Sequence, residues 1–401
     1  MWQQRDLAYC SNVHPAATLA GVQRDTLAAV AAVRECRGLA EMAAGLWLSA
    51  EAAAALDRDA DALEAFAAAL NGAGLRLVTL NGFPYGDFHG PALKQRVYRP
   101  DWAQPARAEY TLRLARILAA CLPADVASGS ISTLPLGFAR DWDADRQLAA
   151  LVALCGLAAD LAALQQQTGR TIRVCLEMEP ACVLERTDQA IDLFIRQLPA
   201  TAAALGIPAG TLQAHLGICF DVCHQAVMFE SPGESLTRLV DAGIAIGKIQ
   251  VSSALELRAP AAGDPADALG AFAEPRFLHQ VLTLDQDGRA YGVLDLPEAL
   301  AMTAAGPGLG RARPWRVHFH VPIQAAGLDH PALTTTQPAI LEVLDFLAEH
   351  PALHPDLEVE TYTWQVLPQS LRPDDAGALQ AGLAGELDWL AQAMHERGLL
   401  R

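Results

Sequence analysis

The sequence predicts a closed (β/α)8 barrel, a TIM barrel, formed by a single domain over residues 1–401. Two observations carry this prediction. Short apolar, β-branched segments alternate with long Ala- and Leu-rich segments whose apolar residues recur at helical spacing. Strands that alternate with helices of this length form parallel β-α-β units, and about eight such units close into a barrel.

Nine segments are candidates for the eight barrel strands: 7–13, 45–49, 76–81, 127–132, 172–178, 215–221, 246–252, 316–321 and 357–362. The weakest candidate is 45–49, which could simply lead into the helix after it. Helical periodicity is present in the segments 51–70, 106–121, 145–167, 187–204 and 336–349, and a last helix is expected over 377–396.

One region, residues 254–315, breaks this rhythm and is rich in Pro, Gly and Ala. It contains the pattern of a β-hairpin, FLHQVLTL and RAYGVLDL joined by DQDG, in which Asp287-Gly288 is a favourable turn pair. We expect an insertion on the barrel rim, serving as a lid or a contact surface, rather than a second domain. A homo-oligomer could form through it.

Composition and charge exclude several classes of protein. The net charge of −17 and the pI near 5.0 oppose nucleic-acid binding, which needs a basic surface. The apolar runs fall short of the roughly 18–20 residues of a membrane helix, and the N-terminus does not resemble a secretory signal. We therefore expect no membrane segment and a cytoplasmic location. The eight cysteines form no CxxC pair and are expected to be reduced thiols, mostly buried.

Each predicted strand becomes polar toward its C-terminal end, and alternate residues of a strand share one face. The polar residues near these ends are Asn12, His14, Asn81, Ser130, Ser132, Glu177, Glu179, Asp221, His224, Lys248, Gln250, Ser252, His318, His320, Glu358, Glu360 and Tyr362. Barrel enzymes build their active sites at this face, and an unpaired buried charge is strongly unfavourable. A functional pocket is favoured, with a structural ion-pair network as the alternative.

A cluster of carboxylates must be neutralised by a cation or must take up protons. Glu177, Asp221 and Glu360 are the first candidates for metal ligands, with His224 or His320 completing the set. Carboxylate oxygens with one imidazole suit a divalent metal such as Mn, Mg, Co or Zn, bound as one or two ions. A hydrogen-bonded core role remains the alternative for each histidine.

The remaining polar residues are candidates for substrate binding: Asn12, His14, Asn81, Glu179, Gln250, His318 and Tyr85. Glu179 precedes Pro180, so it is also an alternate metal ligand or a cap of the loop. The segment LNGFPYGDFHG lacks P-loop spacing and is expected to form the pocket rim, with Phe83, Tyr85 and His89 near the substrate.

Lys248 is one of two lysines beside 27 arginines in the chain. A lysine on the pocket face of a strand suggests chemistry that needs a compact ammonium group, in substrate binding or acid–base work. A salt bridge to Glu177 or Asp221 is the alternative.

The strings CLEMEP, FDVCH and EVETYTW resemble the xylose isomerase-like barrel superfamily of sugar isomerases, epimerases and endonuclease-IV-type enzymes. In that superfamily an acid ends one strand, an acid-x-x-His motif ends the next, and a carboxylate on the last strand completes the metal site. Glu177, Asp221 with His224, and Glu360 match these positions. Where many sugar epimerases place a metal-binding histidine, this chain has Gln250.

A resemblance over nearly the whole chain is to the EboE-type "metabolite traffic" proteins of bacterial ebo clusters. It rests on YCSNVHP, LNGFPYGDFHG, SGSISTLPLG, DVCHQAVMFE, KIQVSSAL and EVETYTW. That family is sugar isomerase/epimerase-like and is associated with the production or export of a small metabolite.

These resemblances imply a metal-dependent isomerase or epimerase acting on a small polyhydroxylated substrate, a sugar or a cyclitol. A metal would bind the substrate oxygens, Glu177 and Glu360 would move the proton, and His224 and Lys248 would orient or polarise the substrate. Two alternatives stay open: a zinc phosphodiesterase of the endonuclease IV type, which the net charge disfavours, and a non-catalytic metabolite-binding barrel.

Overall fold

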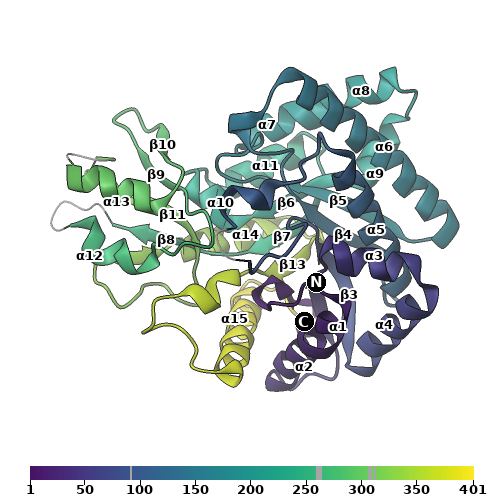
Figure 1. Cartoon of the computed structure of the whole chain (residues 1–401), viewed down its shortest axis with the longest axis horizontal. Helices are drawn as coiled ribbons and strands as arrows, with labels where there is room; N and C mark the ends of the chain where they lie inside the picture. The colour runs from purple at the N-terminus through teal and green to yellow at the C-terminus, as the bar shows by residue number, and fades with distance from the viewer. Residues whose placement is uncertain (91–92, 259–263, 306–308, 311–312) are drawn as a thin grey trace.

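The computed structural model describes residues 1–90, 93–258, 264–305, 309–310 and 313–401. Eight strands form one parallel sheet in the order β1-β13-β7-β6-β5-β4-β3-β2 (Figure 1). Their bounds are β1 (Ala8–Tyr9), β2 (Met42–Trp47), β3 (Leu75–Asn81), β4 (Ser128–Thr133), β5 (Thr171–Glu177), β6 (Leu216–Asp221), β7 (Ile246–Val251) and β13 (Asp356–Val359). A parallel bridge between Cys10 and Gly45 joins the two ends of the sheet and closes the ring, so the predicted barrel is confirmed.

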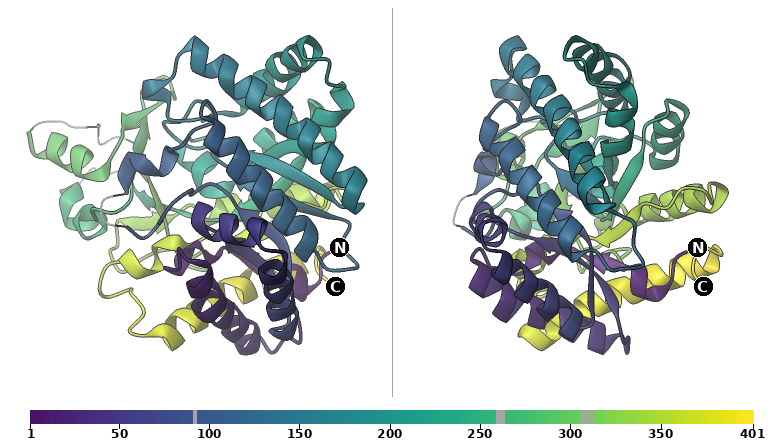
Figure 2. Two further views of the ribbon diagram at one scale, coloured as in Figure 1. Left: turned by 45° about the vertical axis from the view of Figure 1, so that its right-hand side comes forward. Right: turned by 90° about the vertical axis from the view of Figure 1, so that its right-hand side faces the viewer.

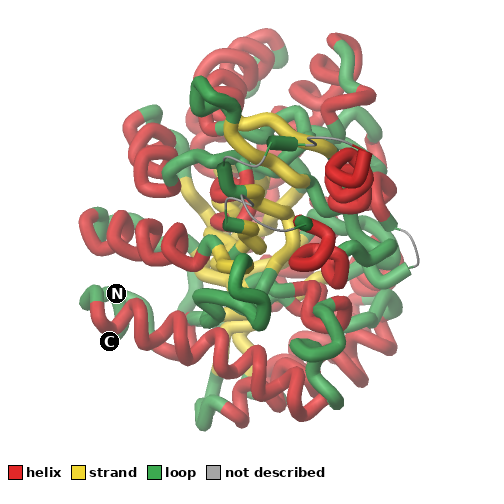
Figure 3. The backbone as a smooth tube through the Cα atoms, turned by 90° about the vertical axis from the view of Figure 1, so that its left-hand side faces the viewer, coloured by secondary structure: helices red, strands yellow, loops and turns green. Residues whose placement is uncertain are grey.

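Helices surround the strands on the outside, as the views from the side show (Figures 2 and 3). Their bounds are α1 (Leu19–Gly21), α2 (Leu27–Cys36), α3 (Ala50–Arg58), α4 (Ala60–Gly72), α5 (Pro105–Cys121), α6 (Ala144–Thr168), α7 (Thr187–Asp192), α8 (Leu198–Ala204), α9 (Ala209–His215), α10 (Val222–Val227), α11 (Pro232–Asp241), α14 (Gln337–Glu349) and α15 (Ala376–Glu396). The helix predicted over 51–70 is two helices, because Asp59 is extended and its carboxylate caps α4 at the amides of Asp61 and Ala62.

Two strand predictions need correction. The doubt about 45–49 was wrong, because β2 is a full barrel strand, buried throughout. Its sequence, MAAGLW, consists largely of small residues with low β propensity, so the sequence pattern of this strand is weak. The segment 316–321 is a strand, β11 (Trp315–His320), but it lies outside the barrel, because hydrophobic pattern alone does not say which sheet a buried strand joins.

A second sheet of five antiparallel strands lies beside the barrel, on the left in Figure 1. Its order is β10 (Ala290–Val293), β9 (Val281–Leu284), β11, β8 (Ala254–Leu257) and β12 (Leu333–Thr335). The helices α12 (Pro265–Leu269) and α13 (Leu296–Ala305) accompany it. The sheet continues past residue 315, where the insertion was expected to end, because β11 and β12 complete it.

One helix, α6, is long and apolar enough to cross a membrane by length and composition alone, although the sequence analysis expected no such segment. This is weak support for a membrane span, because the core helices of barrels pass the same test. Here α6 packs between α5 and α9 against β5 and buries Leu151, Leu154 and Leu161. Its role in the fold is that of a crossover helix.

Candidate functional site

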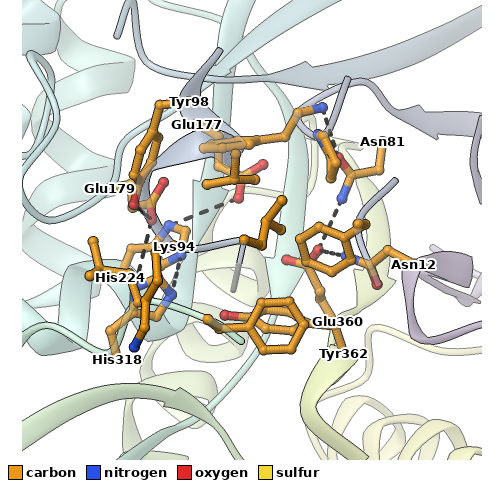
Figure 4. A pocket seen from close by; sticks show the side chains of 17 residues that line it. Asn12, Asn81, Lys94, Tyr98, Glu177, Glu179, His224, His318, Glu360 and Tyr362 are labelled. Atoms are coloured by element: carbon orange, nitrogen blue, oxygen red, sulfur yellow. Dashed lines mark hydrogen bonds and ion pairs between the residues drawn. The ribbon is translucent and has the colours of Figure 1, made fainter. Parts of the chain in front are cut away.

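A pocket opens at the C-terminal ends of the barrel strands, between the barrel and the second sheet (Figure 4). Its polar side is formed by Asn12, Asn81, Glu177, Glu179, His224, His318 and Glu360. Its apolar side is formed by Phe83, Pro84, Phe88, Leu93, Val97, Phe277, Leu278 and Tyr362. Residues far apart in the sequence therefore meet here, and the second sheet supplies part of the wall.

Three carboxylates meet at the base of this pocket. One oxygen from each of Glu177, Asp221 and Glu360 lies within 4.8 Å of the others, and all three side chains are buried. Burial and then the neighbouring carboxylates raise the pKa of Glu177 and of Glu360 well above the ordinary value. Three acids this close must share protons or a cation.

Asp221 is held by the start of the helix that follows it. It ends β6, and its Oδ1 accepts hydrogen bonds from the His224 amide at 2.8 Å and the Ser252 hydroxyl at 2.9 Å. The motif DVCH thus works as a helix cap that fixes the carboxylate and brings His224 onto the first turn. Oδ2 of Asp221 has no hydrogen-bond partner among the described residues, and neither does Oε2 of Glu177.

Glu360 is oriented by two amide groups. Its Oε1 accepts hydrogen bonds from Nδ2 of Asn12 at 2.7 Å and Nδ2 of Asn81 at 2.9 Å. His89 in turn bonds through Nε2 to the main-chain oxygen of Asn12 at 2.7 Å. The rim loop therefore supports the carboxylate through Asn12.

His320 lies next to the carboxylates, in a possible ligand group with Asp221 and His224. Its Nδ1 lies 2.8 Å from the main-chain oxygen of Glu360, which only accepts, so Nδ1 carries the proton. Its Nε2 then presents a lone pair, and this buried atom has no partner in the part of the chain that is described. Burial lowers the pKa of His320 to about 4, which keeps the imidazole neutral. A neutral histidine whose Nδ1–H is bonded to an oxygen can bind a metal ion through its free Nε2.

These observations show that the residues present fit a divalent metal. Glu177, Asp221, Glu360 and His320 offer three carboxylates and one neutral imidazole, with buried atoms that lack partners among the described residues. Gln250 lies beside Asp221 in the sheet register, and neither atom of its amide has a partner in the described residues. Its oxygen is a further weak donor.

Lys248 lies outside the pocket, contrary to the expected substrate role. Its ammonium is fully buried in the barrel, 2.7 Å from Oε2 of Glu358 and 3.3 Å from the Ser132 hydroxyl. Burial alone would lower its pKa, but Glu358 reverses the effect and the net pKa is raised. The partner of the salt bridge is thus Glu358 and not Glu177 or Asp221, because Lys248 lies one pleat deeper in the barrel.

Three other predicted substrate residues, His14, Tyr85 and the fully buried Gln250, also lie outside the lining of this pocket. His14 bonds through Nε2 to the Tyr9 hydroxyl at 2.8 Å and borders a separate hollow beside Arg372. Tyr85 packs on Tyr110 and lines a neighbouring surface hollow. His14 follows Asn12 and Tyr85 follows Asn81 in the chain, and both asparagines line the pocket. Residue type alone does not show which residues of these segments reach the pocket.

Several lining residues were missed by the sequence analysis. Tyr98 donates its hydroxyl to Oε1 of Glu179 at 2.7 Å, and Gln280 bonds to His318. Phe277 and Lys94 belong to the rim, where Nζ of Lys94 is 2.6 Å from Oδ2 of Asp295. Lys94 and Tyr98 lie on a short 3-10 helix, and Phe277 and Gln280 lie in the segment before β9, where no strand periodicity marks a pocket face.

No protein-family model and no curated protein sequence matches this chain. Solved structures with a similar fold include a xylose isomerase domain protein from Planctomyces limnophilus, with 14% identity, 93% of each chain covered and a TM-score of 0.48. Another is a D-tagatose 3-epimerase-like protein, with 12% identity, coverage of 98% and 99%, and a TM-score of 0.49. A third is the IOLI protein with a bound zinc atom, with 11% identity, coverage of 97% and 98%, and a TM-score of 0.48. Identities this low do not carry residue roles from one protein to another.

Proposed function

We propose that this protein is a metal-dependent isomerase or epimerase of a small polyhydroxylated substrate, a sugar or a cyclitol. The observation that supports it most is the meeting of the buried carboxylates of Glu177, Asp221 and Glu360 beside the pocket, where Asp221 also belongs to a second possible ligand group with His224 and His320. A divalent metal bound there would polarise a substrate carbonyl and the neighbouring hydroxyl. Mn, Mg, Co and Zn all accept these ligands.

Proton transfer falls to Glu177, at the end of β5, and Glu360, directly after β13, which both line the pocket. A carboxylate on each side of the substrate could take a proton from the carbon next to a carbonyl and return it. His224 and Asn12 would orient the substrate hydroxyls. Lys248 takes no part, since Glu358 holds it below the pocket.

The pocket wall indicates the kind of substrate. Aromatic rings of Phe83, Phe88 and Phe277 can pack on the C–H face of a sugar ring, while the opposite side offers hydrogen bonds. The one Lys or Arg among the described lining residues is Lys94, and Asp295 already pairs with it. This favours an uncharged polyol over a sugar phosphate.

The test is deuterium exchange into a panel of ketoses, aldoses and inositol ketones in D2O with each of the four metals. The wild type should incorporate deuterium and form the isomer, whereas Glu177→Gln and Glu360→Gln should each be slower by about 10²–10⁴-fold. Glu64→Gln, on the exposed face of α4, is the matched control and should behave as the wild type. Full turnover by both pocket variants would rule the proposal out.

We extend the proposal to a role in making or exporting a small metabolite in the cytoplasm, on the strength of the EboE-type strings in the sequence. The protein would then act without nucleic acid and could do so as a homo-oligomer. Comparing metabolites of cells with and without the intact gene tests this extension. An unchanged profile would contradict it.

A zinc phosphodiesterase is a second candidate, because His224, His318 and His320 form a nitrogen-rich ligand group beside the carboxylates. Hydrolysis of bis(p-nitrophenyl) phosphate by the zinc-loaded protein would favour it. If no panel substrate turns over and no ester is cleaved, while metal and a sugar still bind, the barrel is a binding protein.

A further inference from the structure

The tautomer of His224 is fixed by its surroundings. Its Nδ1 lies 2.9 Å from the main-chain oxygen of Met178. A carbonyl oxygen only accepts hydrogen bonds, so Nδ1 of His224 must carry a proton. In the neutral ring, Nε2 is then a lone pair.

The tautomer of His318 is fixed as well, through Gln280. Nε2 of Gln280 donates to the main-chain oxygen of Pro180 at 3.0 Å and to the Tyr98 hydroxyl at 3.2 Å. This settles which end of the amide is nitrogen, because Pro180 offers only an acceptor there. Oε1 of Gln280 therefore faces Nδ1 of His318 at 2.7 Å, and Nδ1 must donate.

When both rings are neutral, their Nε2 lone pairs consequently lie close together. Nε2 of His224 and Nε2 of His318 are 3.0 Å apart, with the rings inclined at 82°. A cation between the two rings, a proton or a metal ion, makes this contact favourable.

The distance suits a metal ion bound to both nitrogens. With Zn–N bonds of about 2.0–2.1 Å, two imidazoles at the angles of a tetrahedral or octahedral ion have nitrogens roughly 2.9–3.4 Å apart. Each Nδ1–H is already bonded to an oxygen, as is usual for metal-bound histidines.

A third donor lies beside them. An oxygen of Glu179 and a ring nitrogen from each of the two histidines all lie within 4.8 Å of one another. The Tyr98 hydroxyl donates to Oε1 of Glu179 at 2.7 Å and so restrains this carboxylate. All three residues line the pocket, so an ion held by them would keep a coordination position open toward the substrate.

We propose a second metal site, formed by Glu179, His224 and His318, that is distinct from the carboxylate-rich site of Glu177, Asp221 and Glu360. Its two nitrogens and one oxygen select a borderline ion such as Zn²⁺, whereas the carboxylate-rich site also suits Mn²⁺ or Mg²⁺. This site goes beyond the proposed function, which requires only the carboxylate-rich site.

Metal titration of the chelator-stripped full chain tests the proposal, with Co²⁺ as a visible probe and elemental analysis after loading with Zn²⁺. The wild type should bind two equivalents, and His318→Asn should bind one, because Asn keeps an N–H near Nδ1 but lacks Nε2. His395→Asn, at an exposed position on α15, is the matched control and should still bind two.

The variants separate the two sites. Glu360→Gln should retain the His-site ion and its Co²⁺ visible spectrum, and Glu179→Gln should weaken that ion by about 10–100-fold while preserving the Tyr98 hydrogen bond. Glu179→Gln also serves if His318→Asn does not fold. If the wild type binds only one equivalent of metal, and His318→Asn and Glu179→Gln still bind it, the second site is overturned and the proposed function stands. If the wild type binds only one equivalent of metal, and His318→Asn and Glu179→Gln lose it while Glu360→Gln keeps it, the second site is supported and the result counts against the proposed function.

Discussion

Two layers of buried charge lie one above the other inside the barrel, and they are neutralised in different ways. In the deeper layer, Lys248 and Glu358 form an ion pair with both side chains fully buried. In the upper layer, Glu177, Asp221 and Glu360 meet without a lysine or arginine partner among the residues that the structure describes. Both layers are equally hidden from solvent, so burial does not distinguish a structural charge from a functional one. The counter-charge does, because Lys248 lies 2.7 Å from Oε2 of Glu358 in the deeper layer.

The largest effect is expected in the deeper layer. Lys248→Met should lower the free energy of unfolding by about 3–5 kcal/mol, because Glu358 would remain buried without its counter-charge. The matched control is Lys94→Met, which removes the chain's other lysine from a partly exposed pair with Asp295 and should change stability by at most about 1 kcal/mol. Urea denaturation measures both. Equal losses of stability in the two variants would contradict the assignment of Lys248 and Glu358 to a buried structural ion pair.

The stability that the upper layer contributes should depend on pH in the metal-free protein, and bound metal should remove this dependence. The folded pKa values of Glu177 and Glu360 are raised above the ordinary value of 4.5, so the metal-free folded chain binds protons more tightly than the unfolded chain. This contribution to stability is fully present below pH 4.5 and is lost as the pH rises toward the folded pKa values.

Urea denaturation of the metal-free protein between about pH 5 and 8 should show this decline. Saturating Mn²⁺ should flatten it, because the ion replaces the protons, and should add about 2.7 kcal/mol at one hundred times its Kd. Glu360→Gln should also flatten the decline in metal-free protein. A wild-type stability that rises across this range would contradict the unpaired acids of the upper layer.

The smallest effect comes from neighbours paired across β3 and β4, Asn81 and Ser132. Asn81 donates to Glu360 in the upper layer, so Asn81→Ala should raise the Kd of the metal by about tenfold or more. Ser132 contacts Lys248 in the deeper layer, so Ser132→Ala should lower stability by about 1 kcal/mol and leave the metal Kd unchanged. Calorimetric titration with Mn²⁺ measures the metal Kd of both variants. An equal change of this Kd in the two variants would contradict the assignment of Asn81 and Ser132 to different layers.

Much of the candidate site could be located from the sequence because strand periodicity is local. Glu177 and Glu179 share a face by their spacing, and DVCH places an acid and a histidine at one helix start. The same periodicity indicated that Lys248 faces inward but not how deep it lies. Depth depends on the stagger between strands, which here sets Glu358 opposite Gln250 and Asp356 opposite Lys248.

The alternation of strands and helices, the polar strand ends and the acids able to hold a metal could all be predicted from local sequence patterns. It depends on the tertiary structure that β11 leaves the barrel and still brings His318 to the pocket and His320 to the vicinity of Asp221. The tertiary structure also decided which nitrogen of each histidine stays free, since Met178, Gln280 and the main chain of Glu360 are far away in sequence. Periodicity reports which face a residue occupies within its own element. The partners that it meets depend on how distant elements pack, and a local pattern does not contain that information.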